Sequence, residues 1–119
     1  MFNKIFSKEK LNKKLKEYPQ ISFIIAAHNE EKVIKKKLEN TISLDYDPNK
    51  MDVIVASDNS DDKTNEIVKE FIKNNQAENT PKIKLYIVKE RKGKTNAQNE
   101  AIREASGEII AFSDANTIW

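Results

Sequence analysis

The 119-residue sequence contains no cysteine and only two glycines, Gly93 and Gly107. The absence of cysteine excludes disulfides and thiolate metal sites, and it is compatible with a reducing cytosol. Two glycines are too few for the G-x-G-x-x-G turn of dinucleotide-binding Rossmann sites. The stretch Gly93-Lys94-Thr95 matches the end of a P-loop, but Val88 stands where the earlier glycine is needed. A Walker-type phosphate site is therefore excluded as well.

Long apolar runs and a strong charge of one sign are also missing. No apolar run approaches the roughly 18 residues of a membrane span, and the N-terminus lacks the pattern of a secretory signal. The net charge is only +2, and residues 1–17 contain six lysines and two glutamates. A basic tail on a body without basic excess argues against a nucleic-acid partner. We therefore expect a cytoplasmic protein that binds no nucleic acid.

The length allows one domain with a modest core. We interpret residues 1–19 as a basic leader and residues 20–119 as the domain. The apolar residues of the leader do not form one clean helical stripe. A solvated helical leader is the simpler interpretation, and the alternative is a cationic segment that contacts anionic lipid headgroups.

After Pro19, short apolar runs alternate with stretches that have apolar residues at helical spacing. The predicted strands are residues 21–27, 51–57, 83–88 and 108–113, and the predicted helices are residues 31–44, 62–74 and 95–105. This alternation predicts an α/β fold, in which right-handed crossovers cover both faces of a parallel sheet. Gly107 is expected to end the last helix in a left-handed conformation.

Polar residues follow every predicted strand, at the end of a parallel sheet where ligands usually bind. These tips read His28-Asn29-Glu30, Asp58-Asn59-Ser60-Asp61-Asp62, Arg91-Lys92-Gly93-Lys94-Thr95 and Asp114-Ala115-Asn116. Carboxylates beside a basic turn suit a phosphate-bearing ligand with a divalent cation. Each tip also has a structural explanation, since aspartates cap helices or form turns and a lone lysine is usually solvated.

Four segments together carry a resemblance to a known family. FIIAAHNEE, VIVASDNSDDKT, KGKTNAQNEAI and SGEIIAFSDANT resemble, in this order, the donor-binding half of family 2 glycosyltransferases. The resemblance runs from about residue 21 to the C-terminus. It implies a GT-A fold, which is a Rossmann-like parallel sheet, here truncated. It also implies binding of a nucleotide-diphosphate sugar, most often a UDP-sugar, for inverting transfer to an acceptor hydroxyl.

The resemblance assigns the first two strand tips to the nucleoside. Ala26, His28 and Glu30 fall where the family lines the pocket for base and ribose, and His28 replaces a frequent tyrosine. Asp58 matches the aspartate that hydrogen-bonds the base, usually uracil.

The other two tips correspond to the diphosphate and its metal. Lys94, helped by Arg91, matches the basic turn near the diphosphate. Asp114 matches the first carboxylate of the D-x-D motif, which binds Mg or Mn. Asn116 replaces the second aspartate, and its amide oxygen can still ligate magnesium with less charge. Processive, membrane-associated members share this variant, so the resemblance is compatible with membrane association of a longer parent.

The family's acceptor site and catalytic base have no counterpart in this sequence. We therefore expect a truncated product, a fragment or an incomplete record that binds its donor weakly, and the saccharide or lipid-linked acceptor stays unknown. Two alternatives remain open at this point. One is a receiver-like signalling domain that takes a phosphoryl group on Asp58, although the acidic pair that receivers need after the first strand is missing. The other is a noncatalytic nucleotide-binding remnant that pairs with a partner through its sheet edge.

Overall fold

The computed structural model describes residues 19–119, so the predicted basic leader lies outside the described residues except for Pro19. The elements are β1 (Ile21–Ala27), α2 (Ile34–Ile42), η1 (Pro48–Lys50), β2 (Met51–Ser57), α3 (Thr64–Asn74), β3 (Lys82–Ile87), α4 (Lys94–Ala101), η2 (Ile102–Glu104) and β4 (Ile109–Asp114). None of the helices in this part of the chain is long and apolar enough to cross a membrane.

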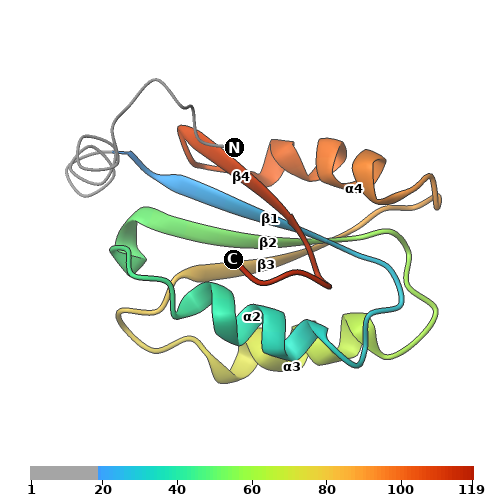
Figure 1. Ribbon diagram of the computed structural model, residues 1–119, viewed down its shortest axis with the longest axis horizontal. Coiled ribbons are helices and arrows are strands. Elements are labelled where there is room, and N and C mark those ends of the chain that lie inside the picture. Colours follow the sequence, from blue (N-terminus) through green and yellow to red (C-terminus); the bar gives the residue numbers. More distant parts are fainter. Residues whose placement is uncertain (1–18) are drawn as a thin grey trace.

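All four strands form one parallel sheet in the order β3-β2-β1-β4. Helices α2 and α3 cover one face and α4 covers the other (Figure 1). A right-handed crossover that steps along the sheet in one direction places its helix on one face, and a step in the opposite direction uses the other face. The first two crossovers step outward from β1, whereas the third returns past β1 to β4. The predicted α/β sheet with helices on both faces is confirmed.

Burial on both faces explains why β1 and β2 are almost continuously apolar. Every residue of these two central strands is buried. Alternate side chains of β1 enter different layers of the core, as the two-residue period of a strand requires. The layer under α2 and α3 includes Phe23, Ile25, Ile34, Leu38, Val68 and Phe71, and the layer under α4 includes Ile24, Ile54, Ala97 and Ala101.

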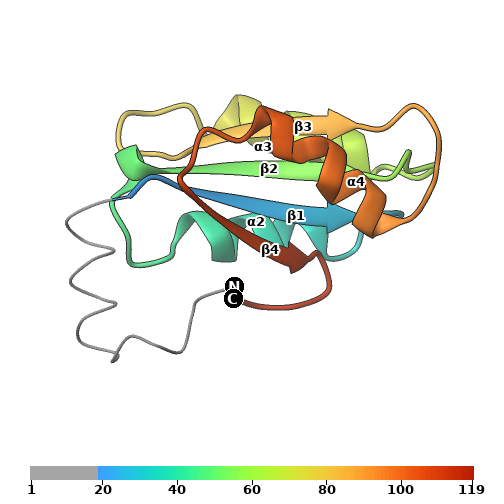
Figure 2. The ribbon, with the colours of Figure 1, turned by 90° about the horizontal axis from the view of Figure 1, so that it is seen from above.

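The strand order reverses between β1 and β4, and this reversal locates the site. The strands run in the same direction, so their carboxyl ends meet at one edge of the molecule (Figure 2). Ligands of open α/β sheets bind outside the carboxyl ends at such a reversal. Glu30 follows β1 and Asp114 ends β4, so these two carboxylates flank it.

The sequence-based prediction for Gly107 is wrong. The described residues with positive φ are Gly93, Asn29, Asn59 and Asn79. Gly107 instead lies against the start of β1, where an added Cβ would stand 2.5 Å from the backbone nitrogen of Ser22. Glycine is needed there for close approach of two backbones, a constraint that no local helix-ending rule reveals.

Each of the three predicted helices is shorter in the structure, and α3 begins at Thr64 rather than at residue 62. Helix α2 begins at Ile34 rather than at residue 31, because residues 31–33 form a turn in which the Glu30 carbonyl accepts from Val33 and Ile34. Helix α4 ends at Ala101, and the chain tightens into η2 before β4. A tighter last turn is a common way for a helix to end.

Candidate functional site

Lys94 connects two strand tips at the point where the strand order reverses. It is the first residue of α4. Its Nζ lies 2.6 Å from Oε2 of Glu30 and 3.1 Å from Oδ2 of Asp114. These side chains are partly buried, with 32% of Lys94 and 10% of Glu30 exposed. Three residues that are far apart in sequence therefore form one charged cluster.

The charges in this cluster alter one another's protonation. Burial alone would lower the pKa of Lys94, but its hydrogen bonds to Glu30 and Asp114 outweigh burial and raise it. Burial would likewise raise the pKa of Asp114, but the Asn116 amide and the Lys94 ammonium lower it. Both Lys94 and Asp114 are therefore charged near neutral pH.

Asn116, which is itself a predicted metal ligand, contacts both carboxylates of the charged cluster. Its Nδ2 donates to Oε2 of Glu30 at 3.1 Å, and its backbone amide donates to Oδ1 of Asp114 at 3.0 Å. Within residues 19–119, no group of three or more His, Cys, Asp or Glu side chains could hold a metal by itself. A metal that relies on substrate phosphates needs fewer protein ligands, since Mg²⁺ is commonly held by one or two carboxylates together with phosphates and waters. The oxygens of Asp114, Glu30 and Asn116 fit such a cation.

Asp58 fastens the basic turn to the tip of β2. The residue is only 2% exposed. Its Oδ1 accepts from the amide of Lys92 at 3.1 Å and its Oδ2 from the amide of Gly93 at 2.9 Å. A buried carboxylate engaged in this way is poorly placed to accept a phosphoryl group, so the receiver interpretation is not favoured. The predicted contact of Asp58 with a base remains a prediction.

His28 and Ala26 each contact a backbone group of a neighbouring segment. Nδ1 of His28 lies 2.7 Å from the carbonyl oxygen of Asp58. A carbonyl can only accept, so Nδ1 carries the proton of this hydrogen bond. Ala26 is buried, and its carbonyl accepts from the amide of Ala115 at 3.0 Å, which anchors the turn after β4. Their predicted contacts with base and ribose also remain predictions.

Arg91 lies apart from the charged cluster. It forms an exposed ion pair with Asp61. Asp61 in turn belongs to the loop after β2, which is tied to the loop after β1 because Oδ1 of Asn29 accepts from the amides of Asp61 and Asp62. Of the predicted site residues, Glu30, Lys94, Asp114 and Asn116 are thus brought together directly, and Arg91 is not.

The sequence motifs did not point to Lys37, which is fully buried in α2. Its Nζ donates to Oγ of Ser113 and to the carbonyl of Thr117, both at 2.6 Å, and lies 4.4 Å from the ring centroid of Trp119. Burial lowers the pKa of Lys37, and the charge of Asp114 offsets part of this effect. A signal was available, because position 37 follows Val33 by one helical turn and therefore lies on the apolar face of α2.

Replacing Lys37 with methionine is expected to loosen the turn after β4 while global stability changes by less than about 1.5 kcal/mol. Methionine keeps the apolar stem and removes the cost of burying an ammonium, but the carbonyl of Thr117 loses its hydrogen-bond donor. The amide of Thr117, bonded to the Asp114 carbonyl at 3.1 Å, should exchange with deuterium about tenfold faster. Exchange measured by NMR checks this, with the exposed neighbour Lys36→Met as control. Equal exchange of the Thr117 amide in both variants would show that Lys37 does not hold the turn after β4.

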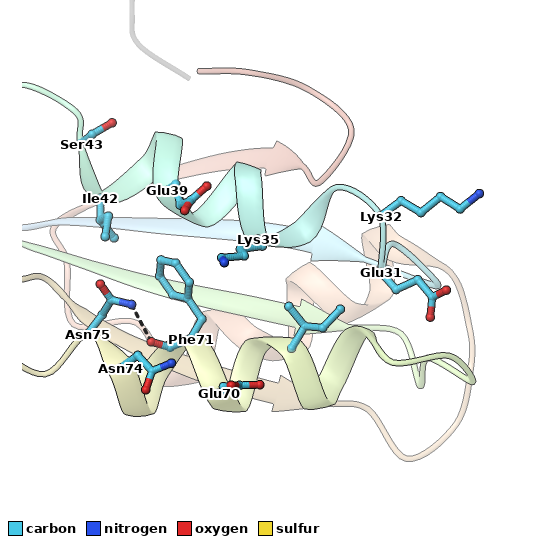
Figure 3. Close-up of a pocket in the computed structure, with 11 residues that line it drawn as sticks. Glu31, Lys32, Lys35, Glu39, Ile42, Ser43, Glu70, Phe71, Asn74 and Asn75 are labelled. Atoms are coloured by element: carbon cyan, nitrogen blue, oxygen red, sulfur yellow. Dashed lines mark hydrogen bonds between the residues drawn. The ribbon is translucent and has the colours of Figure 1, made fainter.

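Two hollows lie near these elements. The first, about 400 Å³, is at the strand tips and is lined by Glu30, Asn116, Asn29, Glu31, Lys32, Val33 and Asp62. The second, about 820 Å³, lies between α2 and α3, where Lys35 and Phe71 contribute to its lining (Figure 3). The lining of this second groove contains none of the predicted site residues. The hollow at the strand tips is therefore the one that adjoins the charged cluster, because Glu30 and Asn116 line it.

Comparisons with known proteins find glycosyltransferases among the relatives of this chain. The chain is 38% identical over 110 residues to a protein of Bacillus subtilis named probable glycosyltransferase YdaM, covering 90% of this chain and 25% of that protein. It is also 38% identical over 98 residues to a poly-beta-1,6-N-acetyl-D-glucosamine synthase of Staphylococcus epidermidis, covering 82% of this chain and 22% of the relative. The chain thus spans about a quarter of the length of these curated relatives.

Solved structures show the same fold. A mannosyltransferase from Pyrobaculum calidifontis in complex with GDP-Man and Mn²⁺ superposes with a TM-score of 0.78 and 33% identity, over 85% of this chain and 28% of that one. TarS of S. aureus in complex with UDP-GlcNAc superposes with a TM-score of 0.67 and 27% identity, over 82% and 26% of the two chains. These likenesses confirm the GT-A fold. Residues 22–119 match the profile of glycosyl transferase family 2, and the chain therefore belongs to that family.

Proposed function

We propose that this chain is the donor-binding part of a glycosyltransferase and that it binds a nucleoside-diphosphate sugar, with uracil as the base, together with Mg²⁺ or Mn²⁺. One observation carries the proposal. Lys94 lies between Glu30 and Asp114 at the carboxyl ends of β1 and β4, which provides both a cation for phosphate and carboxylates for a metal. The structural relatives in complex with GDP-Man and Mn²⁺ and with UDP-GlcNAc support the ligand class.

The proposed arrangement assigns each part of the donor to one part of the site. The diphosphate lies against Lys94 and the first amides of α4, because a helix N-terminus favours anions. Asp114 and Asn116 hold the cation, which when bound neutralises the diphosphate and stabilises it as a leaving group. The nucleoside base lies toward His28 and Asp58. His28 contacts the carbonyl of Asp58, and the carboxylate of Asp58 accepts from the amide of Gly93 in the turn before α4.

The proposed reaction is inverting glycosyl transfer. An acceptor hydroxyl loses its proton to a carboxylate base and attacks the anomeric carbon as the diphosphate departs. We assign that base to a part of a longer protein, since the curated relatives are about four times as long as the aligned region. The relatives named as polysaccharide synthases support a saccharide acceptor.

We further propose that the longer protein works in the cytoplasm, at the cytoplasmic face of the membrane. The cysteine-free sequence and the lysine-rich N-terminal segment support this location. Fractionation of cells that express the longer protein checks it. Recovery of the protein outside the cytoplasmic compartment would contradict the proposal.

A thermal-shift measurement tests the proposed function. UDP with MnCl₂ at about ten times Kd is expected to stabilise the chain by about 1.4 kcal/mol, which corresponds to roughly 7 °C in melting temperature. Asp114→Ala should lose most of this gain, because it removes the proposed carboxylate ligand. GDP with MnCl₂ tests the identity of the base. A larger gain in melting temperature with GDP than with UDP would show that the preferred base is guanine and not uracil.

Asp45→Ala is the matched control. Asp45 is exposed and precedes β2 at the amino end of the sheet, so its loss changes the net charge equally without touching the site. The Asp45 variant should keep the gain. Equal gains in all three proteins would refute the assigned site, and the absence of a gain with either nucleotide would refute the proposed function.

A further inference from the structure

One ammonium group contacts two carboxylates that come from the tips of neighbouring strands. Lys94 Nζ contacts Oε2 of Glu30 at 2.6 Å and both carboxylate oxygens of Asp114, at 3.1 and 3.3 Å. Carboxylates that share a site repel each other unless a cation lies between them. The lysine therefore occupies the position that a metal held by Glu30 and Asp114 would need.

The ammonium group of Lys94 can move while the backbone of the turn stays fixed. Asp58 accepts from the amides of the two preceding residues, Lys92 and Gly93. The Lys94 side chain is about one third exposed and has a flexible four-carbon stem. Its ammonium can leave the carboxylates and turn toward the N-terminus of α4 without any shift of the sheet.

We propose that Lys94 is an internal counter-ion that competes with the divalent cation for Glu30 and Asp114. When a cation takes these carboxylates, the lysine is released and pairs with the diphosphate of the donor. This inference rests on the proposed function, because it specifies how the same site couples metal to donor. It makes Glu30 a cation-facing residue, in addition to the base and ribose role that the resemblance implies.

The competition has a thermodynamic consequence. A metal without nucleotide must break the contacts of Lys94 and leave an ammonium beside a dication, so it binds weakly. A diphosphate that accepts the released ammonium removes this penalty, so each ligand strengthens binding of the other by the same factor. Removing the ammonium should strengthen binding of the metal alone and weaken the coupling.

Binding of Mn²⁺ to the 119-residue chain, followed by electron paramagnetic resonance, tests the competition. Lys94→Met should bind Mn²⁺ alone at least about tenfold more tightly than wild type, since a repelling charge a few ångströms away is removed. Lys94→Arg keeps the charge and should bind no more tightly than wild type. Lys92→Met is the matched control, because Lys92 is an exposed lysine of the same turn that pairs with Glu90.

Equal or weaker Mn²⁺ binding by Lys94→Met would overturn the proposal. A second measurement needs no variant. Acetic anhydride should acetylate Lys94 of the wild type at least about threefold more with MgCl₂ than without it, and UDP added with MgCl₂ should protect the amine again. Unchanged acetylation with MgCl₂ would also overturn the proposal.

These outcomes are separate from those of the proposed function. The proposed function fails if UDP and GDP both leave the wild-type affinity for Mn²⁺ unchanged. The counter-ion role alone fails if UDP strengthens Mn²⁺ binding in the wild type but Lys94→Met binds Mn²⁺ alone no better than the Lys92→Met control.

Discussion

Replacing Asp58 with alanine is expected to destabilise the chain by about 2 kcal/mol, which lowers the melting temperature by roughly 10 °C. Asp58 is 2% exposed, and its carboxylate accepts from two amides of the turn before α4. Hydrogen bonds to a charged acceptor are stronger than neutral ones, and their loss frees the turn from β2. Lys92 and Gly93 are exposed, so their amides regain water and the cost stays moderate.

The same substitution should also reduce the gain from UDP with MnCl₂, because the released turn carries Lys94. Asp61→Ala is the control, since Asp61 is an exposed aspartate after the same strand and its ion pair with Arg91 is a surface pair. Thermal melts with and without ligand measure both effects. A melting temperature of Asp58→Ala that equals that of Asp61→Ala would show that Asp58 does not hold the turn.

Replacing Gly107 with alanine is expected to cost about 3 kcal/mol, the upper range for overpacking a close contact. The added Cβ would lie 2.5 Å from the Ser22 nitrogen and 2.9 Å from the Gln20 carbonyl oxygen. Both are backbone atoms at the start of β1, and the Gln20 carbonyl also accepts from the amides of Glu108 and Ile109. The clash therefore separates the first residues of β1 from β4.

Urea denaturation measures this loss. Ser106→Ala is the matched control, because Ser106 is exposed and adjacent and should change stability by less than about 0.5 kcal/mol. Gly107 lies before β4, at the end of the sheet opposite to Asp114, so a folded Gly107→Ala chain should still bind UDP with MnCl₂. Equal stability of the two variants would refute the close approach.

The central strands were predictable because their sequences reflect their surroundings. Strands β1 and β2 begin and end at the predicted residues, since runs buried on both faces change abruptly to polar tips. Strands β3 and β4 lie at the edges of the sheet, where exposed and buried residues mix, and their observed bounds differ from the predicted ones by one residue. An edge strand is less apolar throughout, so its ends are less marked.

The two glycines show how a local rule can select the wrong residue. Gly107 was assigned the left-handed conformation because it follows a helix, yet Gly93 adopts a φ of 99°. Gly93 precedes α4, where the Asp58 carboxylate fixes the turn. Neither the close approach at Gly107 nor the turn at Gly93 is encoded by neighbouring residues alone, because both depend on contacts across the sheet.

The sequence by itself determined the family, the parallel α/β sheet and the presence of carboxylates and a basic turn at the strand ends. Those features follow from local periodicity and from motifs in a given order, and parallel strands necessarily bring their carboxyl ends to one edge. Only the tertiary structure decided which charges meet. It placed Lys94 between Glu30 and Asp114, used Asp58 as the anchor of the turn and buried Lys37 behind Ser113 and Thr117. Such pairings join residues that are between 20 and 80 positions apart, so they depend on how the loops pack over the sheet.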